Sequence, residues 1–345
     1  MGKTGVCTLV LAGILLLFSG AAADGVAQGV DLCLNVLIPS LFLFLVLAAR
    51  AAQRPPKNGR WMVPTIILLS FIGGYPAGAR SLSLLHEKGF LSRRQCAWLL
   101  CGCVNAGPPF VVTFVGLSLL HNEWAGWLLL ISCTLAALFS LGVGNLLFRP
   151  ERGFSLQANR APLAAPESDT WFSAVSQGAR SLLQLCTLVV AFSGLLSVLQ
   201  KAGLYDALNA LPVSLPGCDN ARLCALLLEV TTGCRAAVQG GCALPLLAFG
   251  LSFGGICVQL QVFSFFPRFP LKKSVYLLIR LSCAGVAALC CRGLLSLFPQ
   301  TLTTLAPLPS FQAAQTPVPV LLLTLFLILA ALQGVHIAPR IRERV

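Results

Sequence analysis

The chain has 345 residues, of which 57% are hydrophobic and only 10% charged, and its mean hydropathy is +0.85. Soluble domains carry about 25% charged residues, so this composition excludes a soluble enzyme and predicts an all-α polytopic membrane protein in a lipid bilayer. The net charge of +13 does not indicate a nucleic-acid partner, because the basic residues lie at the ends of apolar segments.

Six apolar segments approach the ~20 residues that a helix needs to cross the hydrocarbon. In chain order they are 5–22, 30–49, 124–148, 181–199, 275–298 and 317–336. The first is ambiguous, because Lys3 and the small residues at 19–23 also fit a cleaved secretory signal; we favour a retained span. Basic residues gather in alternate connections and the opposite connections hold mainly Lys201 and Arg222, which predicts cytoplasmic termini.

Between these spans, the segment 61–88 is interrupted by Gly73-Gly74-Tyr75-Pro76-Ala77-Gly78-Ala79-Arg80. Irregular backbone at membrane depth is tolerated only inside protein or beside a water-filled cavity. The interruption therefore predicts a reentrant hairpin made of helix 61–72, loop 73–77 and helix 78–88. Its second helix would direct N–H groups and the charge of Arg80 towards a cavity.

The segment 95–120 is a helix broken by Asn105-Ala106-Gly107-Pro108-Pro109, since proline in a helix interior costs about 3 kcal/mol. In the second half of the chain, 220–240 predicts another reentrant hairpin that contains Glu229-Val230-Thr231-Thr232-Gly233-Cys234-Arg235, with Gly233 at its break and the two threonine hydroxyls as a cap or as ligand donors. The following helix, 244–265, is interrupted by Ser252-Phe253-Gly254-Gly255.

Charged residues inside apolar segments need a partner or a wet cavity, because burial of one costs from ~2.5 kcal/mol upward. Glu229 is therefore a candidate for binding a coupling ion, H⁺ or Na⁺, or for pairing with Arg235. Two readings of Arg80 and Arg235 stay open: they bind a solute anion bidentately, or they extend to water at the hairpin ends. Gln259 and Gln261 either face a ligand or bond a neighbouring helix.

Short matches recur at nearly one offset. Gln28-Gly29 matches Gln177-Gly178 at 149 residues, Gly78-Ala79-Arg80 matches Gly233-Cys234-Arg235 at 155, and Gly107 matches Gly255 at 148. The charge pattern gives the two halves opposite orientations, which predicts the inverted repeats that are typical of transporters. The predicted units are a first span or signal-like anchor 1–24, repeat 25–148, cytoplasmic linker 149–172, repeat 173–300, and a last span with basic tail 317–345.

The order GGYPAGAR, NAGPPF, LEVTTGC and SFGGICVQLQ over residues 25–300 resembles the YlbJ-type sporulation integral membrane proteins. These belong to the nucleoside-recognition or Gate domain group, which is similar to concentrative nucleoside transporters. The resemblance implies a bacterial cell membrane protein that passes a small anionic solute, dipicolinate, across the outer forespore membrane. The substrate-binding residues that it implies are Gly74, Tyr75, Pro76, Gly78, Arg80, Asn105, Gly107, Pro108, Glu229, Thr231, Thr232, Gly233, Ser252, Gly254, Gly255 and Gln259, to which the charge argument adds Arg235.

The sequence thus favours a permease with alternating access over two other classes. A non-transporting scaffold or gating subunit of a sporulation complex is the first alternative, and a nucleoside transporter is the other permease reading. A membrane enzyme is disfavoured, because neither paired intramembrane carboxylates nor a Ser/His/Asp arrangement is found. The cysteines have no metal-site spacing and read as small hydrophobic residues, so no metal or cofactor is expected. A homo-oligomer or a sporulation membrane partner is compatible with this reading.

Overall fold

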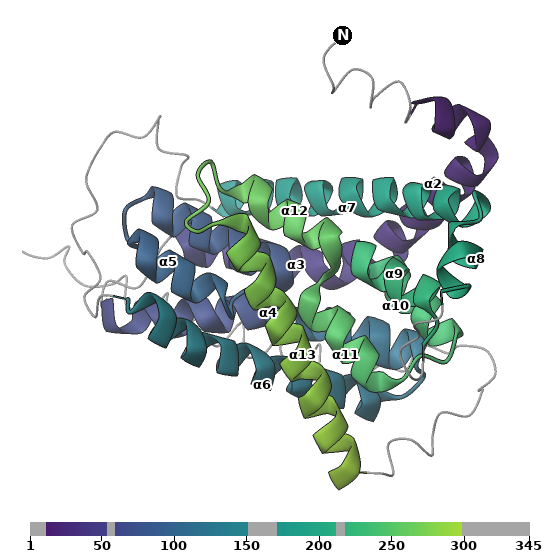
Figure 1. Ribbon diagram of the computed structural model, residues 1–345. Helices are drawn as coiled ribbons and strands as arrows, with labels where there is room; N and C mark the ends of the chain where they lie inside the picture. Colours follow the sequence, from purple (N-terminus) through teal and green to yellow (C-terminus); the bar gives the residue numbers. More distant parts are fainter. Residues whose placement is uncertain (1–11, 54–58, 151–170, 212–217, 299–345) are drawn as a thin grey trace, which may run out of the picture. The chain divides into compact units, whose positions relative to one another are not determined.

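The computed structural model describes residues 12–53, 59–150, 171–211 and 218–298, and all of their regular structure is helical. Five of the described segments are long and apolar enough to cross a membrane. They are Ser19–Arg50, Glu123–Phe148, Trp171–Lys201, Leu244–Phe265 and Lys273–Leu297. The chain is therefore an all-α polytopic membrane protein (Figure 1). The predicted linker and last span lie outside the described residues, as does part of the first segment.

The first long segment is one continuous helical segment made of α2 (Ser19–Leu32), η1 (Cys33–Leu37) and α3 (Ile38–Gln53). The helix is continuous through residue 24, and the division into a first span and a repeat that begins at residue 25 stays a prediction. The π-helical turn η1 comes just before Pro39, which has no N–H to donate and whose ring crowds the carbonyl one turn earlier; widening the helix relieves both problems.

The first interrupted segment folds into a hairpin. α4 (Gly59–Glu87) leaves helical geometry at Gly74, whose φ of 75° and ψ of −170° are essentially restricted to glycine. A Cβ on Gly78 would lie 3.0 Å from the side chain of Ser70, whereas residues so spaced along an unbroken helix are about 12 Å apart. The chain therefore doubles back, and the predicted loop 73–77 is too long because helix resumes right after Gly74. That the hairpin is reentrant in a bilayer stays a prediction.

The predicted break in 95–120 is wider than expected. α5 (Arg93–Leu100) is followed by a non-helical stretch, 101–107, before the π-helix η2 (Pro109–Leu119) and the long α6 (Glu123–Phe148). Pro108 is the N-cap of η2 and Pro109 its first residue, where missing N–H groups cost nothing because the first turn of a helix has no intrahelical acceptor for them.

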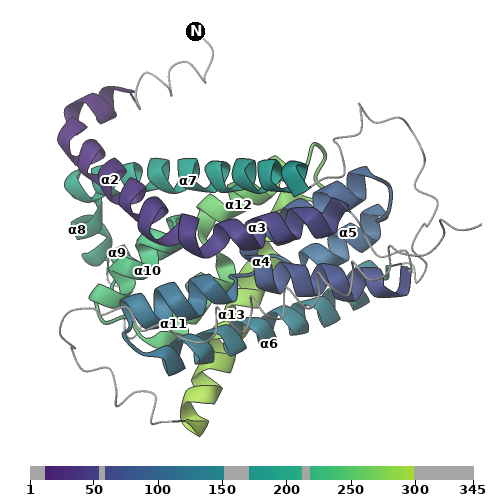
Figure 2. The ribbon, with the colours of Figure 1, turned by 180° about the vertical axis from the view of Figure 1, so that it is seen from behind.

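The second half begins with α7 (Trp171–Lys201) and the short α8 (Leu204–Asn209). α9 (Asn220–Leu228) and α10 (Val230–Gln239) form the second hairpin, followed by α11 (Leu244–Phe253), α12 (Gly255–Phe265) and α13 (Lys273–Leu297). α7 packs along both α2 and α3, and α13 packs against α6 and α11 (Figures 1 and 2). Gly254, with φ of 84°, separates α11 from α12 within the predicted interruption.

The second hairpin breaks at a different residue from the one expected. Glu229 is the extended residue, with φ of −141° and ψ of 118°, whereas Gly233 lies inside α10. A Cβ on Gly233 would lie 2.6 Å from the backbone N of Leu226, so this glycine lets the two arms approach closely. A disulfide between Cys218 and Cys242, with Cα atoms 4.5 Å apart, joins the open ends of the arms.

The two halves make corresponding contacts. A Cβ on Gly74, at the first hairpin break, would lie 3.3 Å from the backbone N of Gly107 in the following break. A Cβ on Gly255, at the α11–α12 break, would lie 3.4 Å from the Cα of Glu229 at the second hairpin break. Each hairpin tip thus touches the break that follows it, and the inverted repeat itself stays a prediction.

Candidate functional site

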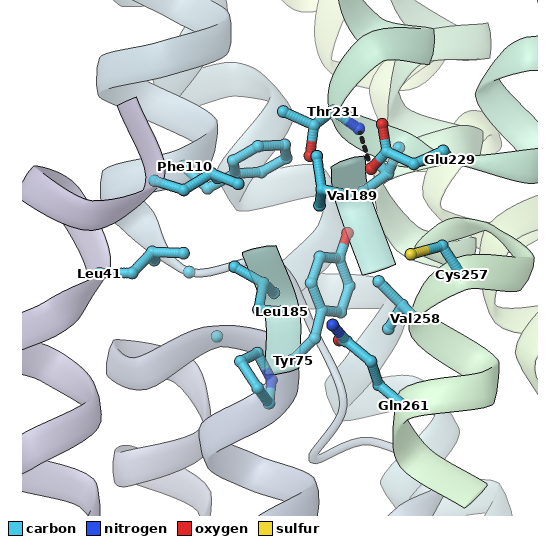
Figure 3. A pocket seen from close by; sticks show the side chains of 15 residues that line it. Leu41, Tyr75, Phe110, Leu185, Val189, Glu229, Thr231, Cys257, Val258 and Gln261 are labelled. Atoms are coloured by element: carbon cyan, nitrogen blue, oxygen red, sulfur yellow. Dashed lines mark hydrogen bonds between the residues drawn. The ribbon is translucent and has the colours of Figure 1, made fainter. Parts of the chain in front are cut away.

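A small cavity, called here the central cavity, lies where both hairpin tips meet the helix after each of them. Its volume is about 30 Å³, which is room for about two water molecules. It is lined by Leu37, Leu41, Gly74, Tyr75, Pro76, Gly107, Phe110, Leu185, Val189, Glu229, Val230, Thr231, Cys257, Val258 and Gln261 (Figure 3). Segments from both halves of the chain therefore build one mostly apolar chamber with few polar groups.

Glu229 is the charged group of this cavity, and its side chain is only 1% exposed. Its carboxylate accepts bonds from the backbone N–H groups of Thr231 at 2.8 Å and Thr232 at 2.6 Å, and from the Thr232 hydroxyl at 2.6 Å. It therefore caps the N-terminus of α10 and does not form the expected ion pair with Arg235. Charge-assisted bonds to otherwise unpaired N–H groups are what makes a carboxylate tolerable at this depth.

Gln261 is the second polar group in the wall. It is 2% exposed, and neither its amide oxygen nor its amide nitrogen has a hydrogen-bond partner among the described residues. Figure 3 shows Glu229 and Thr231 at one end of the lining and Gln261 at the other. An unsatisfied buried amide costs about 1–3 kcal/mol, so the position is suited to a water molecule or a ligand that would supply the missing bonds.

The break after α11 explains several other buried polar side chains. A broken helix leaves its last carbonyls without N–H donors, and here three consecutive carbonyls receive them from three different helices. Tyr75 of α4 donates to the carbonyl of Leu251, Arg280 of α13 to that of Ser252, and Gln259 of α12 to that of Phe253. These bonds fix the hairpin tip and two helices to the same helix end.

Arg280 is completely buried and was not singled out by the sequence analysis. Among the described residues, Arg280 and Glu229 are the charged residues that are buried. Glu229 and Arg280 do not form an ion pair with each other. Glu229 caps the N-terminus of α10, and the side chain of Arg280, which belongs to α13, donates to a carbonyl at the C-terminal end of α11. Because helix ends carry roughly half a charge, positive at the start and negative at the finish, each buried charge faces a helix end of opposite sign.

The structure distributes the predicted site residues over several places. Those that line the central cavity are Gly74, Tyr75, Pro76, Gly107, Glu229 and Thr231. Those that form the supporting backbone or its hydrogen bonds are Gly78, Asn105, Pro108, Thr232, Gly233, Ser252, Gly254, Gly255 and Gln259. Asn105, for example, is buried and donates to the carbonyl of Gly102.

The two predicted anion-binding arginines do not share a pocket. Arg80 lies over the ring of Phe265, with 5.9 Å between its guanidinium carbon and the ring centroid. Arg235 lines a separate polar cleft formed by α7, α8, α9, α10 and α2. No arginine is among the residues that line the central cavity, and anion binding by Arg80 and Arg235 stays a prediction.

Three features escaped sequence reasoning. Arg280 had a visible signal, as a charge inside the apolar segment 275–298, and Gln261 was noted without being assigned to the site. The disulfide had only a weak signal, because Cys218 and Cys242 are separated by 24 residues and follow no recognised spacing.

Comparison of the chain with models of protein families, with curated proteins and with solved structures gives no match.

Proposed function

We propose that this multi-pass membrane protein is a solute permease and that the central cavity is its solute site. The observation that carries the proposal is a buried carboxylate, Glu229, and an unpartnered amide, Gln261, in one cavity at the junction of both hairpin tips. Polar groups at membrane depth are expensive, and in transporters they mark the path of a solute or an ion.

The chemistry of the cavity favours one class of solute. Glu229 supplies acceptor oxygens and Gln261 an amide, while Tyr75 and Phe110 supply aromatic surface. This combination suits a solute with a flat apolar part and hydroxyl or N–H donors, as a nucleoside has. A dianion suits it less, because the carboxylate would repel it and no guanidinium lines the wall.

The cavity volume also bears on mechanism. A space of about 30 Å³ is far below the 300–1,000 Å³ of typical ligand sites. The arrangement therefore corresponds to a closed state, and a solute would enter only after a hairpin moves away. Alternating movement of the two hairpins would provide access from each side, with Glu229 as the group that binds H⁺ or Na⁺ if transport is ion-coupled.

Dipicolinate, the solute that the family resemblance implies, is the second candidate. The observation in its favour is Arg235, which lines the polar cleft and has no ion-pair partner among the described residues. Transport of this dianion across the forespore membrane would place the anion-binding step at that arginine rather than in the central cavity.

The test is uptake of radiolabelled uridine and dipicolinate into vesicles reconstituted with the full chain. Wild type is compared with Glu229→Gln and Arg235→Gln at matched folding, judged by gel filtration in detergent. Uridine flux that is lost in Glu229→Gln but kept in Arg235→Gln supports the proposal. Dipicolinate flux lost in Arg235→Gln supports the second candidate, and no flux of either solute in wild type favours a scaffold or gating subunit.

A further inference from the structure

A second cavity among the described residues is a mainly polar cleft of about 770 Å³, which lies within the 300–1,000 Å³ range of small-molecule sites. We call it the polar cleft. It shares no lining residue with the central cavity, but the two meet at successive residues of α10, because Thr231 lines one and Thr232 the other. Its role is a question separate from that of the central cavity.

One face of α10 supplies the inner wall of this cleft. Thr232, Arg235 and Gln239 line it at positions i, i+3 and i+7, which fall on one side of a helix. The opposite side of α10 is packed into the protein, where Cys234 and Ala237 are fully buried. These three residues therefore form a polar stripe on the side of α10 that faces the cleft.

The lining of the cleft carries three acidic residues, Asp24, Asp206 and Asp219, and three basic residues, Lys201, Arg222 and Arg235, so its net charge is zero. Asp24, Lys201 and Asp206 are exposed, and Arg222 is bonded to Asp219. Arg235 is half-buried and has no ion-pair partner among the described residues.

Arg235 thus gives the cleft a guanidinium that has no ion-pair partner among the described residues, and a guanidinium binds a carboxylate through charge-assisted hydrogen bonds. Ser193 of α7 also lines the cleft, but its hydroxyl is buried against α2, where a Cβ on Gly29 would lie 3.0 Å from its oxygen.

Two independent observations place the mouth of the cleft on the non-cytoplasmic side. The disulfide Cys218–Cys242 closes the base of the second hairpin next to Asp219, and disulfides persist in oxidising compartments. The charge pattern of the sequence leaves Lys201 and Arg222, both lining residues, among the few basic residues on that same side.

We propose that the polar cleft is a vestibule on the non-cytoplasmic face that attracts small anionic solutes through Arg235. The inference does not depend on permease activity, because it concerns the local potential and the side from which the cleft is reached. It gives a role to Arg235, which among the charged lining residues is neither fully exposed nor in an ion pair with another described residue.

The test uses Gln239→Cys, which places a thiol on the same face as Arg235 and one turn beyond it. Right-side-out vesicles are treated with membrane-impermeant methanethiosulfonates of negative and positive charge, with wild type as the blank for native cysteines. At ~6 Å in water, a unit positive charge changes the reaction rate of a charged reagent about threefold. Relative to a free thiol, the introduced cysteine should therefore react about threefold faster with the anionic reagent and about threefold slower with the cationic one.

Adding Arg235→Gln to this background is expected to remove most of that preference, whereas the rim variant Lys201→Gln should leave most of it. Matched elution in gel filtration shows that each variant is folded. Two results would overturn the proposal: labelling of the Gln239→Cys variant only after the vesicles are opened, or a charge preference that Arg235→Gln does not alter.

Discussion

The bond from Tyr75 to the carbonyl of Leu251 allows a sharp test of how the first hairpin is held. Tyr75→Phe keeps the ring, which packs against Gly254, and removes only the hydroxyl. The Leu251 carbonyl then lacks its donor in a buried site, at a cost of about 1–3 kcal/mol of unfolding free energy. Using about 2–4 °C per kcal/mol, the scale for domains of 150–250 residues, Tm should fall by several degrees.

Tyr276→Phe is the matched control. Tyr276 is also buried, but its hydroxyl has no hydrogen-bond partner among the described residues, so the same chemical change removes no bond. Its ring contacts with Phe263 and Phe269 are kept in phenylalanine. Both variants are melted in detergent and followed by tryptophan fluorescence. Equal shifts in the two variants, or a larger loss in Tyr276→Phe, would refute the capping role assigned to Tyr75.

Further predictions concern the second hairpin. Gly233→Ala should lower unfolding free energy by about 1–3 kcal/mol, because its Cβ meets backbone of the opposite arm, while Gly285→Ala, with open space around it, should be neutral or slightly stabilising; melting of both variants checks this. Reduction of Cys218–Cys242 should cost about 2–4 kcal/mol, measured as a Tm shift with and without dithiothreitol, and an unchanged Tm would contradict a structural role for the bridge. Glu229→Ala should cost about 1–2 kcal/mol as a lost helix cap, and hydrogen exchange should rise first in the opening turn of α10; exchange that is unchanged there would argue against the cap.

The coarse architecture could be predicted because hydropathy and helix-breaking residues are local signals. Membrane-length apolar segments, both hairpin regions and the α11–α12 break follow from composition and from glycine and proline positions. Exact break points depend on tertiary contacts. Gly233 looked like a hairpin tip, but the chain turns at Glu229, because a glutamate can cap the next helix while glycine is needed where the arms touch.

The site was harder to predict than the fold, because the spacing of residues along the sequence does not determine which side chains are buried or which groups they pair with. Arg80 and Arg235 occupy matching positions in the predicted repeat, yet they lie in different surroundings. Arg280 serves a carbonyl from another helix, 28 residues away in sequence. A charge inside an apolar segment indicates that some partner exists, but only the packed structure shows that the partner is a helix end.

The way Glu229 is neutralised affects how the protein would respond to membrane voltage. A counter-ion on a separate helix would stay behind if the second hairpin moved, but the charges that balance Glu229 belong to the same hairpin. Its charged residues are Asp219, Arg222, Glu229 and Arg235, whose charges sum to zero, and the dipole of α10 adds no net charge. A full charge crossing 100 mV is worth about 2.3 kcal/mol, so movement of the neutral hairpin across the same field would need little electrical work.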